Sequence, residues 1–391
     1  MYKYIVFILF ISYCVPGICQ DKTPDDKLDP FYSVKAPEKF KNGKLAFENV
    51  MKIVSSQYYD SKGITEDDLY YAAIKGILRR ISPPKTPTQG KIWSRAEKSA
   101  AMNSLKTQQL FAGFKYEFGS IEGSLRVLSI EQGSPADGFL KVNDLVKRIN
   151  DKELKGKSSS QISEMLKGEK GTEIKLKVVR DIEVLDATLK LKTFKRKYCK
   201  GQIIKDTGYV RLKSFSENAS DEIKEHLEKF KSTGCKSVIL DLRQNTGGYF
   251  TQAIKTAELF LKKRSRILSV VRSSKRTDYQ SFNQSPFDFK VAVLIDRYSA
   301  SSSEIVASAL KENKRAILIG SNSYGKAITE KTFDINNNFY IKFTVGAMYD
   351  IKKGNWHESG LTPDIAVDGK IHENPEEDSV VTKAIEYLKK K

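Results

Sequence analysis

The sequence predicts a multidomain protein of mixed α/β and α+β class, and three observations support this fold class. The chain has 391 residues, more than one hydrophobic core usually serves. Apolar side chains follow helical spacing in residues 45–110, short strands and turns fill residues 111–197, and strands alternate with helices from Gly208 onward. Because such alternation is typical of βαβ units with right-handed crossovers, we expect a C-terminal α/β core in residues 198–370.

Composition and charge exclude several classes of protein. Hydrophobic residues make up 40% and charged residues 29% of the chain, which is ordinary for a globular protein. The formal net charge is +19, but the lysines are spread along the whole chain and form no dense basic arm. We therefore expect no nucleic-acid partner.

The start of the chain has the features of a secretory signal peptide, residues 1–19. A lysine precedes the apolar run Ile5–Ile11, which is too short to span a bilayer, and Gly17 and Cys19 are small residues before the expected cut. We expect an exported protein, periplasmic or associated with the cell envelope. An uncleaved anchor or a lipid on Cys19 stays open, and either would keep the protein near a membrane. Residues 20–44 are expected to be a flexible linker.

The four cysteines predict neither a disulfide framework nor a metal site. Cys14 and Cys19 belong to the signal region, so Cys199 and Cys235 remain. Their spacing matches no metal site. They form one disulfide in an oxidising compartment or stay as two buried thiols, and the sequence leaves both open.

Short apolar runs and turn residues predict the remaining elements. In residues 45–110 we expect helices with Phe47, Val50, Met51 and Val54 on one face. Residues 111–197 should hold three strands, at Leu125–Ile130, starting at Asp144, and at Thr172–Val179. The turn Gly133–Ala136 should open a short helix, and Ser160–Lys167 should form an amphipathic helix. The core should hold strands Ser237–Leu242, Val291–Ile295 and Ala316–Ile319 and helices Gln252–Leu261 and Glu304–Lys311. Residues 371–391 should form a C-terminal helix, Pro375–Leu388, with Asn374 as its N-cap.

The serine-rich segment Tyr298–Glu304 is the densest chemical signal. It follows a buried strand and opens a helix, and such an elbow lifts a hydroxyl out of the sheet. The N-terminus of the helix supplies backbone N–H groups and a positive dipole end, which favour an oxyanion. The alternative is a serine-rich N-cap, which needs only one hydroxyl.

A nucleophilic serine needs a base, and Lys326 is the best candidate. None of the three histidines falls in a recognised triad pattern. Lys326 ends the segment Gly320–Lys326, just after a buried strand. A lysine acts as a base only if its pKa falls, and removal from water lowers it. The alternative is an ordinary exposed loop lysine.

A third segment, Asp241–Gly248, ends in two glycines after a strand. Glycines let backbone approach a ligand closely, and their N–H groups can serve as oxyanion donors. Taken alone, the segment is a turn before a helix.

Together these three segments resemble the carboxyl-terminal processing proteases, also called tail-specific proteases. That family carries D-L-R-x-N-x-G-G, S-A-S-x-S-E-I and G-K segments in this order, and the resemblance runs from about Phe47 to Val367. It implies a crotonase-like core with a mixed sheet. The family's nucleophile is the second serine of its S-A-S run, with the base lysine 25 residues later, and these positions are Ser301 and Lys326.

The resemblance also implies the rest of the catalytic site. The backbone N–H groups of Ser302 and of a glycine in the pair Gly247 and Gly248 would form the oxyanion hole. Glu330 stands where the family often has a glutamine that orients the lysine. A carboxylate there would hold Lys326 protonated unless it is neutral or turned away.

Residues 111–197 resemble the PDZ domain inserted in this family. The carboxylate-binding loop begins at Phe111, which makes Gly113 and Phe114 the candidate substrate-binding residues. Lys115 stands where the family's loop tends to end in glycine. Such a domain adds a substrate tail as an extra strand and holds its carboxylate on backbone N–H groups.

The sequence therefore predicts a serine endopeptidase that cleaves proteins near their C-termini through an acyl-enzyme, guided by the PDZ domain. This reading requires the Lys326 amine within hydrogen-bond reach of the Ser301 hydroxyl. Polypeptide C-terminal tails would be the substrates, no metal or organic cofactor is implied, and a homo-oligomer stays open. One alternative is a catalytically inactive tail-binding protein of the same fold, because of Glu330. Another is a member that binds a small ligand or lipid.

Overall fold

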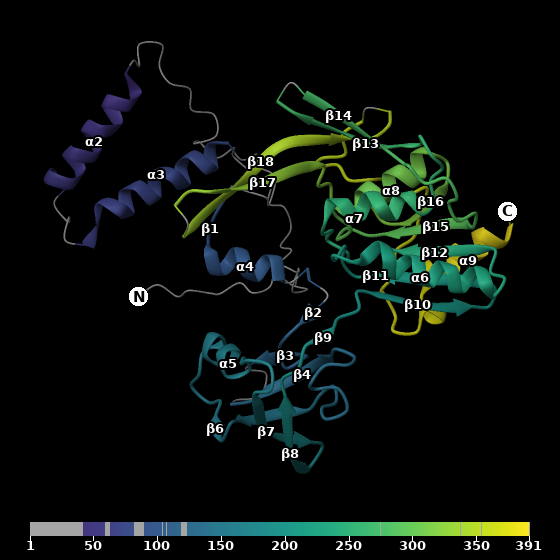
Figure 1. The fold of residues 1–391 in the computed structure, drawn as a ribbon, viewed down its shortest axis with the longest axis horizontal. Helices are drawn as coiled ribbons and strands as arrows, with labels where there is room; N and C mark the ends of the chain where they lie inside the picture. The colour runs from purple at the N-terminus through teal and green to yellow at the C-terminus, as the bar shows by residue number, and fades with distance from the viewer. Residues whose placement is uncertain are drawn as a thin grey trace.

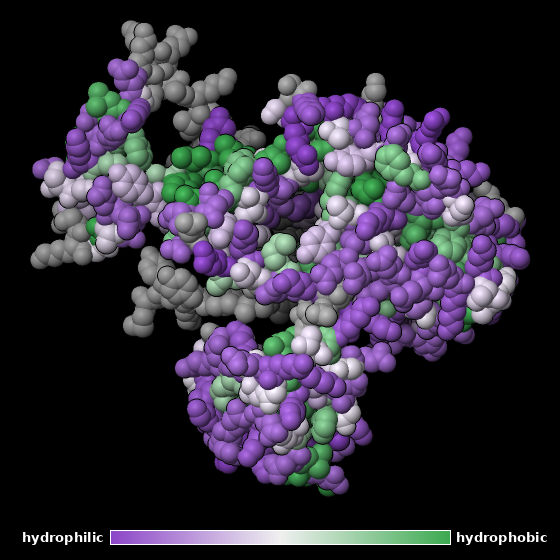
Figure 2. All heavy atoms as spheres, viewed as in Figure 1, coloured by the Kyte–Doolittle hydropathy of each residue, from purple (hydrophilic) through white to green (hydrophobic). Residues whose placement is uncertain are grey.

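The computed structural model describes residues 42–390, except residues 59–62, 82–89, 104, 107, 119–122, 274, 337 and 353. Figure 1 shows N-terminal helices, a central β domain and a larger α/β core that carries the C-terminus. This arrangement confirms the predicted multidomain class. Hydrophilic side chains cover most of the visible face of the core and of the central domain (Figure 2).

The predicted signal peptide and nearly all of the predicted linker lie outside the described residues. No helix within the described part of the chain is long and apolar enough to cross a membrane.

The N-terminal region is helical, as predicted, with one added strand. It contains α2 (Gly43–Gln57), α3 (Glu66–Arg80), β1 (Lys91–Ser94) and α4 (Arg95–Asn103). The side chain of Thr65 accepts from the backbone N–H of Asp68, whose carboxylate accepts from the N–H of Thr65, and this reciprocal cap begins α3. β1 was not expected, because its partner strand lies some 250 residues later in the chain.

The central domain is one antiparallel sheet with a short helix beside it. Its strands lie in the order β3-β4-β5-β7-β8, with β6 beside β5, so β3 is an edge strand. The elements are β3 (Phe114–Phe118), β4 (Leu125–Ile130), β5 (Leu145–Ile149), β6 (Lys152–Glu153), α5 (Ser159–Met165), β7 (Glu173–Arg180) and β8 (Glu183–Lys190). Where the domain joins the core, β2 (Gln108–Gln109) pairs with β9 (Phe194–Lys195).

The short helix expected after the turn at Gly133–Ala136 is not formed, and this prediction was wrong. The segment continues as turns, with the N–H of Leu140 bonded to the carbonyl of Ala136 over 3.0 Å. Gly138 lies between them with φ of 84°, which interrupts right-handed helical backbone.

The core is a mixed six-stranded sheet in the order β10-β11-β12-β15-β16-β19. β10 pairs antiparallel with β11, and every other neighbouring pair is parallel. The elements are β10 (Cys199–Ile204), β11 (Thr207–Leu212), α6 (Ala219–Ser232), β12 (Ser237–Asp241), α7 (Phe250–Glu258), β15 (Lys290–Ile295), α8 (Ser302–Glu312), β16 (Ala316–Gly320) and β19 (Ile365–Ala366). The predicted βαβ alternation is confirmed.

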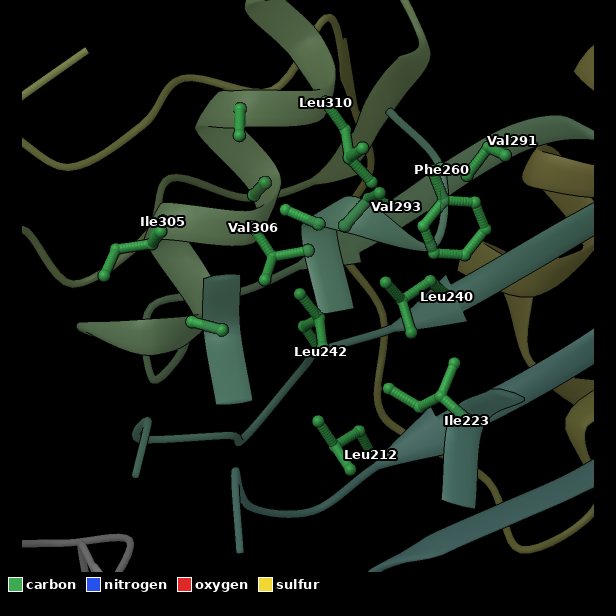
Figure 3. Close-up of a cluster of buried hydrophobic side chains, with 14 of the residues drawn as sticks. Leu212, Ile223, Leu240, Leu242, Phe260, Val291, Val293, Ile305, Val306 and Leu310 are labelled. Carbon is green, nitrogen blue, oxygen red and sulfur yellow. The ribbon is translucent and has the colours of Figure 1, made fainter. Parts of the chain in front are cut away.

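Alternate side chains of this sheet enter two different hydrophobic clusters. Leu240 and Val293 face α6, α7 and α8. Ile239, which directly precedes Leu240 on β12, faces the C-terminal helix α9 (Ser379–Lys390) on the other side of the sheet. In Figure 3 the side chains of Val306 and Leu310 on α8 point toward the strand leucines and valines of the same cluster. Burial of this face fixes where α8 begins, and the serine-rich elbow lies at that point.

A second sheet joins the core to the N-terminal region. It contains β13 (Arg266–Arg272), β14 (Lys275–Gln280), β17 (Ile328–Asp334) and β18 (Phe339–Tyr349) together with β1. β18 is its centre, because β1, β13 and β17 all pair with it antiparallel.

The C-terminal helix begins later than predicted. Asn374 does cap a turn, but that turn is the short 3₁₀ helix η2 (Pro375–Glu377). α9 (Ser379–Lys390) begins after Asp378, whose Oδ1 accepts from the N–H of Val380 over 3.0 Å. A buried ion pair of Asp378, described below, explains this break.

Cys199 and Cys235 are separate buried thiols, and this resolves the alternative left open by the sequence. Burial raises the pKa of the Cys199 thiol far above its ordinary value.

Candidate active site

The strand-to-helix elbow places Ser301 in a strained backbone conformation. Its φ of 55° and ψ of −112° lie outside the regions that residues with a side chain usually adopt. The backbone N–H of Ser301 donates to Oε2 of Glu304 over 2.8 Å, and α8 starts at the next residue. The strain is therefore held by the buried first turn of the helix.

Of the four serines in this segment, Ser301 has the one hydroxyl that donates no hydrogen bond to a carbonyl among the described residues, although its oxygen faces the backbone N–H of Glu304 in a capping box. Its side chain is half-buried, whereas the other three serines are buried. The other hydroxyls each donate to a backbone carbonyl: Ser299 to Leu242 (2.9 Å), Ser302 to Gly248 (3.2 Å) and Ser303 to Asn245 (2.7 Å). Three hydroxyls fix the loop, and the fourth is available for chemistry.

The Glu304 carboxylate ties the serine elbow to the lysine loop. It is fully buried, and Oε2 accepts from the backbone N–H groups of both Ser301 and Lys326, each over 2.8 Å. Oε1 accepts from the N–H of Gly325 over 2.7 Å and from the hydroxyl of Ser323 over 2.5 Å. Burial raises the pKa of Glu304, while these four hydrogen bonds oppose the increase. Because one oxygen holds both amides, the backbones of the two predicted catalytic residues are adjacent.

The Lys326 side chain is engaged by Glu330 in this conformation. Its Nζ donates to Oε2 of Glu330 over 2.8 Å, and the described residues give it no hydrogen bond to Ser301. Lys342 Nζ lies 3.1 Å from the other oxygen of Glu330. Burial alone would raise the pKa of Glu330, but the two lysines lower it below its ordinary value. The carboxylate is thus ionised, and the contact that the protease reading requires is not made here.

The backbone N–H groups of Ser302 and Gly248 lie beside the elbow without an acceptor among the described residues. Ser302 occupies the first position of α8, whose N–H has no intrahelical partner. Gly247 lies against the elbow, because a Cβ added there would be 3.0 Å from Cβ of Ser301. However, the Gly247 N–H already donates to Oδ1 of Asn245 over 2.9 Å. Of the two predicted glycine donors, Gly248 is the one left for an oxyanion.

Asp241 and Arg243 of the glycine-containing segment are structural. Arg243 is buried and donates to Asp241 (2.7 Å) and to Asp378 (2.9 Å), and the hydroxyl of Tyr209 donates to Asp241 over 2.7 Å. Burial would raise the pKa of Asp378, but Arg243 lowers it. This network anchors the start of α9 at the end of β12, the strand that precedes Gly247 and Gly248.

Comparison with known families agrees with this geometry. Residues 206–367 match the family model of Peptidase family S41, and residues 113–191 match that of the PDZ domain. The core region is therefore similar to S41 peptidases, and the central domain is similar to PDZ domains. The predicted resemblance to the carboxyl-terminal processing proteases is confirmed.

Two of the curated relatives that this chain matches carry the same description. A "Probable CtpA-like serine protease" of Staphylococcus aureus (strain bovine RF122 / ET3-1) is 27% identical over 325 residues, which cover 82% of this chain and 64% of the relative. One from Staphylococcus epidermidis is 26% identical over 324 residues, with the same coverage. The chain thus spans just under two thirds of the length of the curated relatives it matches. A solved structure assigned to the S41 proteases, from Bacteroides fragilis, has a TM-score of 0.58 at 16% identity, covers 91% of this chain and 99% of its own, and supports the fold.

The PDZ loop places its two predicted residues differently. Gly113 has φ of 89°, and a Cβ added there would lie 2.1 Å from Cβ of Ser134, so only glycine fits. Phe114 begins β3, and its side chain is buried in the domain core. Phe114 can therefore contact a ligand through its backbone on the open edge of β3.

Sequence reasoning missed three residues around the S41 site. Glu304 appeared only as a helix residue, Lys342 was not considered, and His357 was set aside as a base. The Nδ1 of His357 lies 3.1 Å from the carbonyl of Gly325, so that nitrogen donates, and Nε2 is buried without a partner in the described part of the chain. The flanking Trp356, which is buried, was the available signal that this histidine belongs to the interior.

Proposed function

We propose that this protein is a serine endopeptidase that cleaves polypeptides near their C-termini. Ser301 is the nucleophile, Lys326 is the base, and the N–H groups of Gly248 and Ser302 hold the oxyanion. The PDZ domain captures the substrate tail and delivers the chain to the core.

One observation carries this proposal. The buried Glu304 carboxylate joins the backbone of Ser301 to that of Lys326, and among the described residues the Ser301 hydroxyl is the one in its segment that donates to no carbonyl. A structural N-cap needs neither a strained backbone nor a link to a lysine loop 25 residues later.

The reaction proceeds by acyl transfer. The Ser301 oxygen attacks the peptide carbonyl carbon while its proton passes to the Lys326 amine, and the carbonyl oxygen becomes the oxyanion. The proton then passes to the leaving amine as the C–N bond breaks, which leaves an ester on Ser301. Water attacks this ester with Lys326 again taking the proton, and the acid product leaves. The Lys326 amine must exchange its Glu330 contact for Ser301 before the first step.

The PDZ domain supports tail capture through its edge strand. Among the described residues β3 pairs with β4 alone, so a substrate tail can add as a further strand on its other side. Gly113 keeps the loop close to Ser134, which supports the proposal that the following N–H groups, including that of Phe114, hold the carboxylate of the tail.

A second function, tail binding without cleavage, is favoured by one specific observation. Glu330 is ionised and contacts Lys326, and an ionised carboxylate favours the protonated form of an amine. A protein whose Lys326 stays protonated in this way would bind substrate tails through the PDZ domain but would not cleave them.

The full chain, incubated with an unstructured protein that ends in an apolar tail, distinguishes these functions. We expect cleavage by the wild type that is lost in both Ser301→Ala and Lys326→Ala, with tail binding retained. Lys331→Ala, an exposed lysine on β17, is the matched control and should cleave normally. Tail binding without turnover by the wild type would replace the first function with the second. Absence of both tail binding and cleavage would overturn both.

We also infer export, from the apolar run Ile5–Ile11. Expression in a bacterial host with N-terminal sequencing of the envelope fraction tests this. A chain that begins at Met1 in the cytosolic fraction would contradict it.

A further inference from the structure

Lys326 belongs to a three-member charge cluster rather than to a simple pair. The Glu330 side chain is 12% exposed and lies between the side chains of Lys326 and Lys342, which are 22% and 20% exposed. Lys326 holds one carboxylate oxygen over 2.8 Å, and Lys342 lies 3.1 Å from the other. One anion is thus shared by two cations in a half-buried setting.

Lys342 is held at this place by the second sheet. It lies on β18, where it pairs with Thr332 of β17 on one side and with Lys91 of β1 on the other. Its Nζ lies 5.0 Å from the centre of the Trp93 ring, which also comes from β1. Burial lowers the pKa of Lys342, while Glu330 opposes that effect.

The charged groups that face Glu330 are therefore mostly positive. Lys326 comes from the lysine loop and Lys342 from β18, and Lys91 of β1 adds a weaker repulsion on Lys342. His357 lies on the carbonyl of Gly325, next to the base, as a further titratable group. Among these groups Glu330 is the single carboxylate.

We propose that Lys342 is a positioning residue for the base: by sharing the carboxylate of Glu330, it weakens the hold of Glu330 on Lys326 and lets the Lys326 amine turn to Ser301. This inference rests on the proposed protease function. It assigns a purpose to a carboxylate that would otherwise oppose catalysis, and it extends the site to β18 and β1.

The sign of the effect follows from the charges. Without the positive charge at position 342, Glu330 acts on Lys326 alone and stabilises its protonated form more strongly. The pH at which the base becomes active then rises. We expect a rise of about one pH unit, which is about a tenfold loss of cleavage rate at a pH below the midpoint. Removing the charge of Glu330 has the opposite sign, because Lys342 then repels a protonated Lys326.

The test is the pH profile of kcat/KM for Lys342→Gln, Glu330→Gln and the double variant. We expect the rising limb to move to higher pH in the first and to lower pH in the second. In the double variant the effect of Lys342→Gln should be smaller than in the wild type, since no carboxylate is left to share and only the direct repulsion between Lys342 and Lys326 is removed. Lys331→Gln on the neighbouring strand is the matched control and should leave the midpoint unchanged.

A loss of rate with an unmoved midpoint in Lys342→Gln would show a merely structural effect and overturn the proposal. So would an equal effect of Lys342→Gln with and without the Glu330 charge. Trp93→Leu supplies a second variant that leaves every charge in place. It should move the limb in the same direction by less, because the Lys342 ammonium loses its ring contact.

A second readout does not depend on activity. The rate of acetylation of Lys326 by acetic anhydride, measured by mass spectrometry against pH, follows the unprotonated fraction of this amine. The same shift should appear in Lys342→Gln, and adding Lys342→Gln to Glu330→Gln should cause a smaller shift. If the wild type cleaves no substrate, the proposed function fails, yet a labelling midpoint moved by Lys342→Gln would still support the charge sharing. An unmoved labelling midpoint would overturn it even in an active enzyme.

Discussion

Glu304→Gln is the sharpest test of how this site is held together. The substitution keeps the shape of the side chain but replaces one acceptor oxygen by an NH₂ group, which can only donate. The carboxylate accepts from three backbone N–H groups, of Ser301, Gly325 and Lys326, and from the hydroxyl of Ser323. A glutamine cannot satisfy all four.

The least costly orientation of the glutamine follows from the donors. Only the Ser323 hydroxyl can rotate and become an acceptor, so the NH₂ group should take the position of Oε1. The N–H of Gly325 then faces another donor and is left unpaired, which costs about 1–3 kcal/mol in a buried site.

The hydrogen bonds from Ser301 and Lys326 survive in this orientation, but their acceptor is now neutral. Each loses about 1 kcal/mol, the difference between bonds to charged and to neutral partners. Removing a buried charge offsets part of this loss, because burial raises the pKa of Glu304 and so disfavours its ionised form. The free energy of unfolding of the core should therefore fall by about 2–4 kcal/mol.

Urea unfolding followed by fluorescence measures this change, since Trp356 is buried in the core. We also expect the cleavage rate to fall at least tenfold when it is measured without urea, at a temperature where the variant is fully folded. The reason is that the backbones of Ser301 and Lys326 lose their common anchor. Glu228→Gln on the exposed face of α6 is the control and should change neither quantity. If Glu304→Gln unfolds and cleaves like the wild type, the carboxylate does not hold the two loops together, and the reasoning is refuted.

Three further predictions concern other parts of the molecule. Asp378→Asn weakens the buried pair with Arg243, so the free energy of unfolding should fall by about 3–5 kcal/mol in a urea titration, and equal stability would contradict the anchoring of α9. Arg243 lowers the pKa of Asp378 below its ordinary 3.8, so the stability that ionised Asp378 contributes is fully present above that pH. This stability is lost as the pH falls through the pKa of Asp378 in the folded state. Acid unfolding below about pH 4 should therefore be steeper in the wild type than in Asp378→Asn. In Gly248→Ala the new Cβ would meet the Phe215 carbonyl oxygen at 2.2 Å, so cleavage should be lost while tail binding to the PDZ domain persists, and retained cleavage would exclude Gly248 from the oxyanion hole. Gly113→Ala should weaken tail binding at least tenfold in a fluorescence titration, and unchanged affinity would exclude this loop.

The sequence predicted the elements whose pattern is local. The strand Leu125–Ile130 has the predicted bounds, and the core strands differ from prediction by one residue at an end. Alternating or continuous apolar runs bounded by turn residues determine such strands. The identity of Ser301 came from the resemblance, and the structure adds independent support, because the other three hydroxyls are committed to carbonyls.

The C-terminal helix shows where local reasoning fails. Asn374 and Pro375 form a good helix start, and they do begin a 3₁₀ turn. The chain leaves that turn at Asp378 because Arg243, 135 residues earlier, takes its carboxylate in the core. A long-range ion pair thus overrides a local cap, and no short-range sequence pattern predicts that ion pair.

The cluster around the base could not be predicted for a related reason. Glu330 lies at a register shift between β17 and β18, and a shift of one residue in a strand moves a side chain to the opposite face. The pairing of Lys342 with β1 joins segments about 250 residues apart. The sequence predicts a carboxylate near Lys326, but only the register shows that Lys342 forms an ion pair with the same carboxylate.

The conformation of the site separates what is fixed from what must move. Glu304 fixes the backbones of Ser301 and Lys326 whichever partner the lysine side chain contacts. The step from the observed state to the reactive one therefore needs rotation about the Lys326 side-chain bonds, the loss of one hydrogen bond to Glu330 and the release of a proton from the Lys326 ammonium to solvent, but no movement of either backbone. A partly exposed ion pair of this kind contributes little stability, so a bound peptide that excludes water beside Ser301 can shift the equilibrium without rebuilding either loop. The charges around the Lys326 side chain therefore control which partner it contacts, while the backbones of both loops stay in place. For this reason the sharing of Glu330 between Lys326 and Lys342 determines how readily the Lys326 amine reaches Ser301.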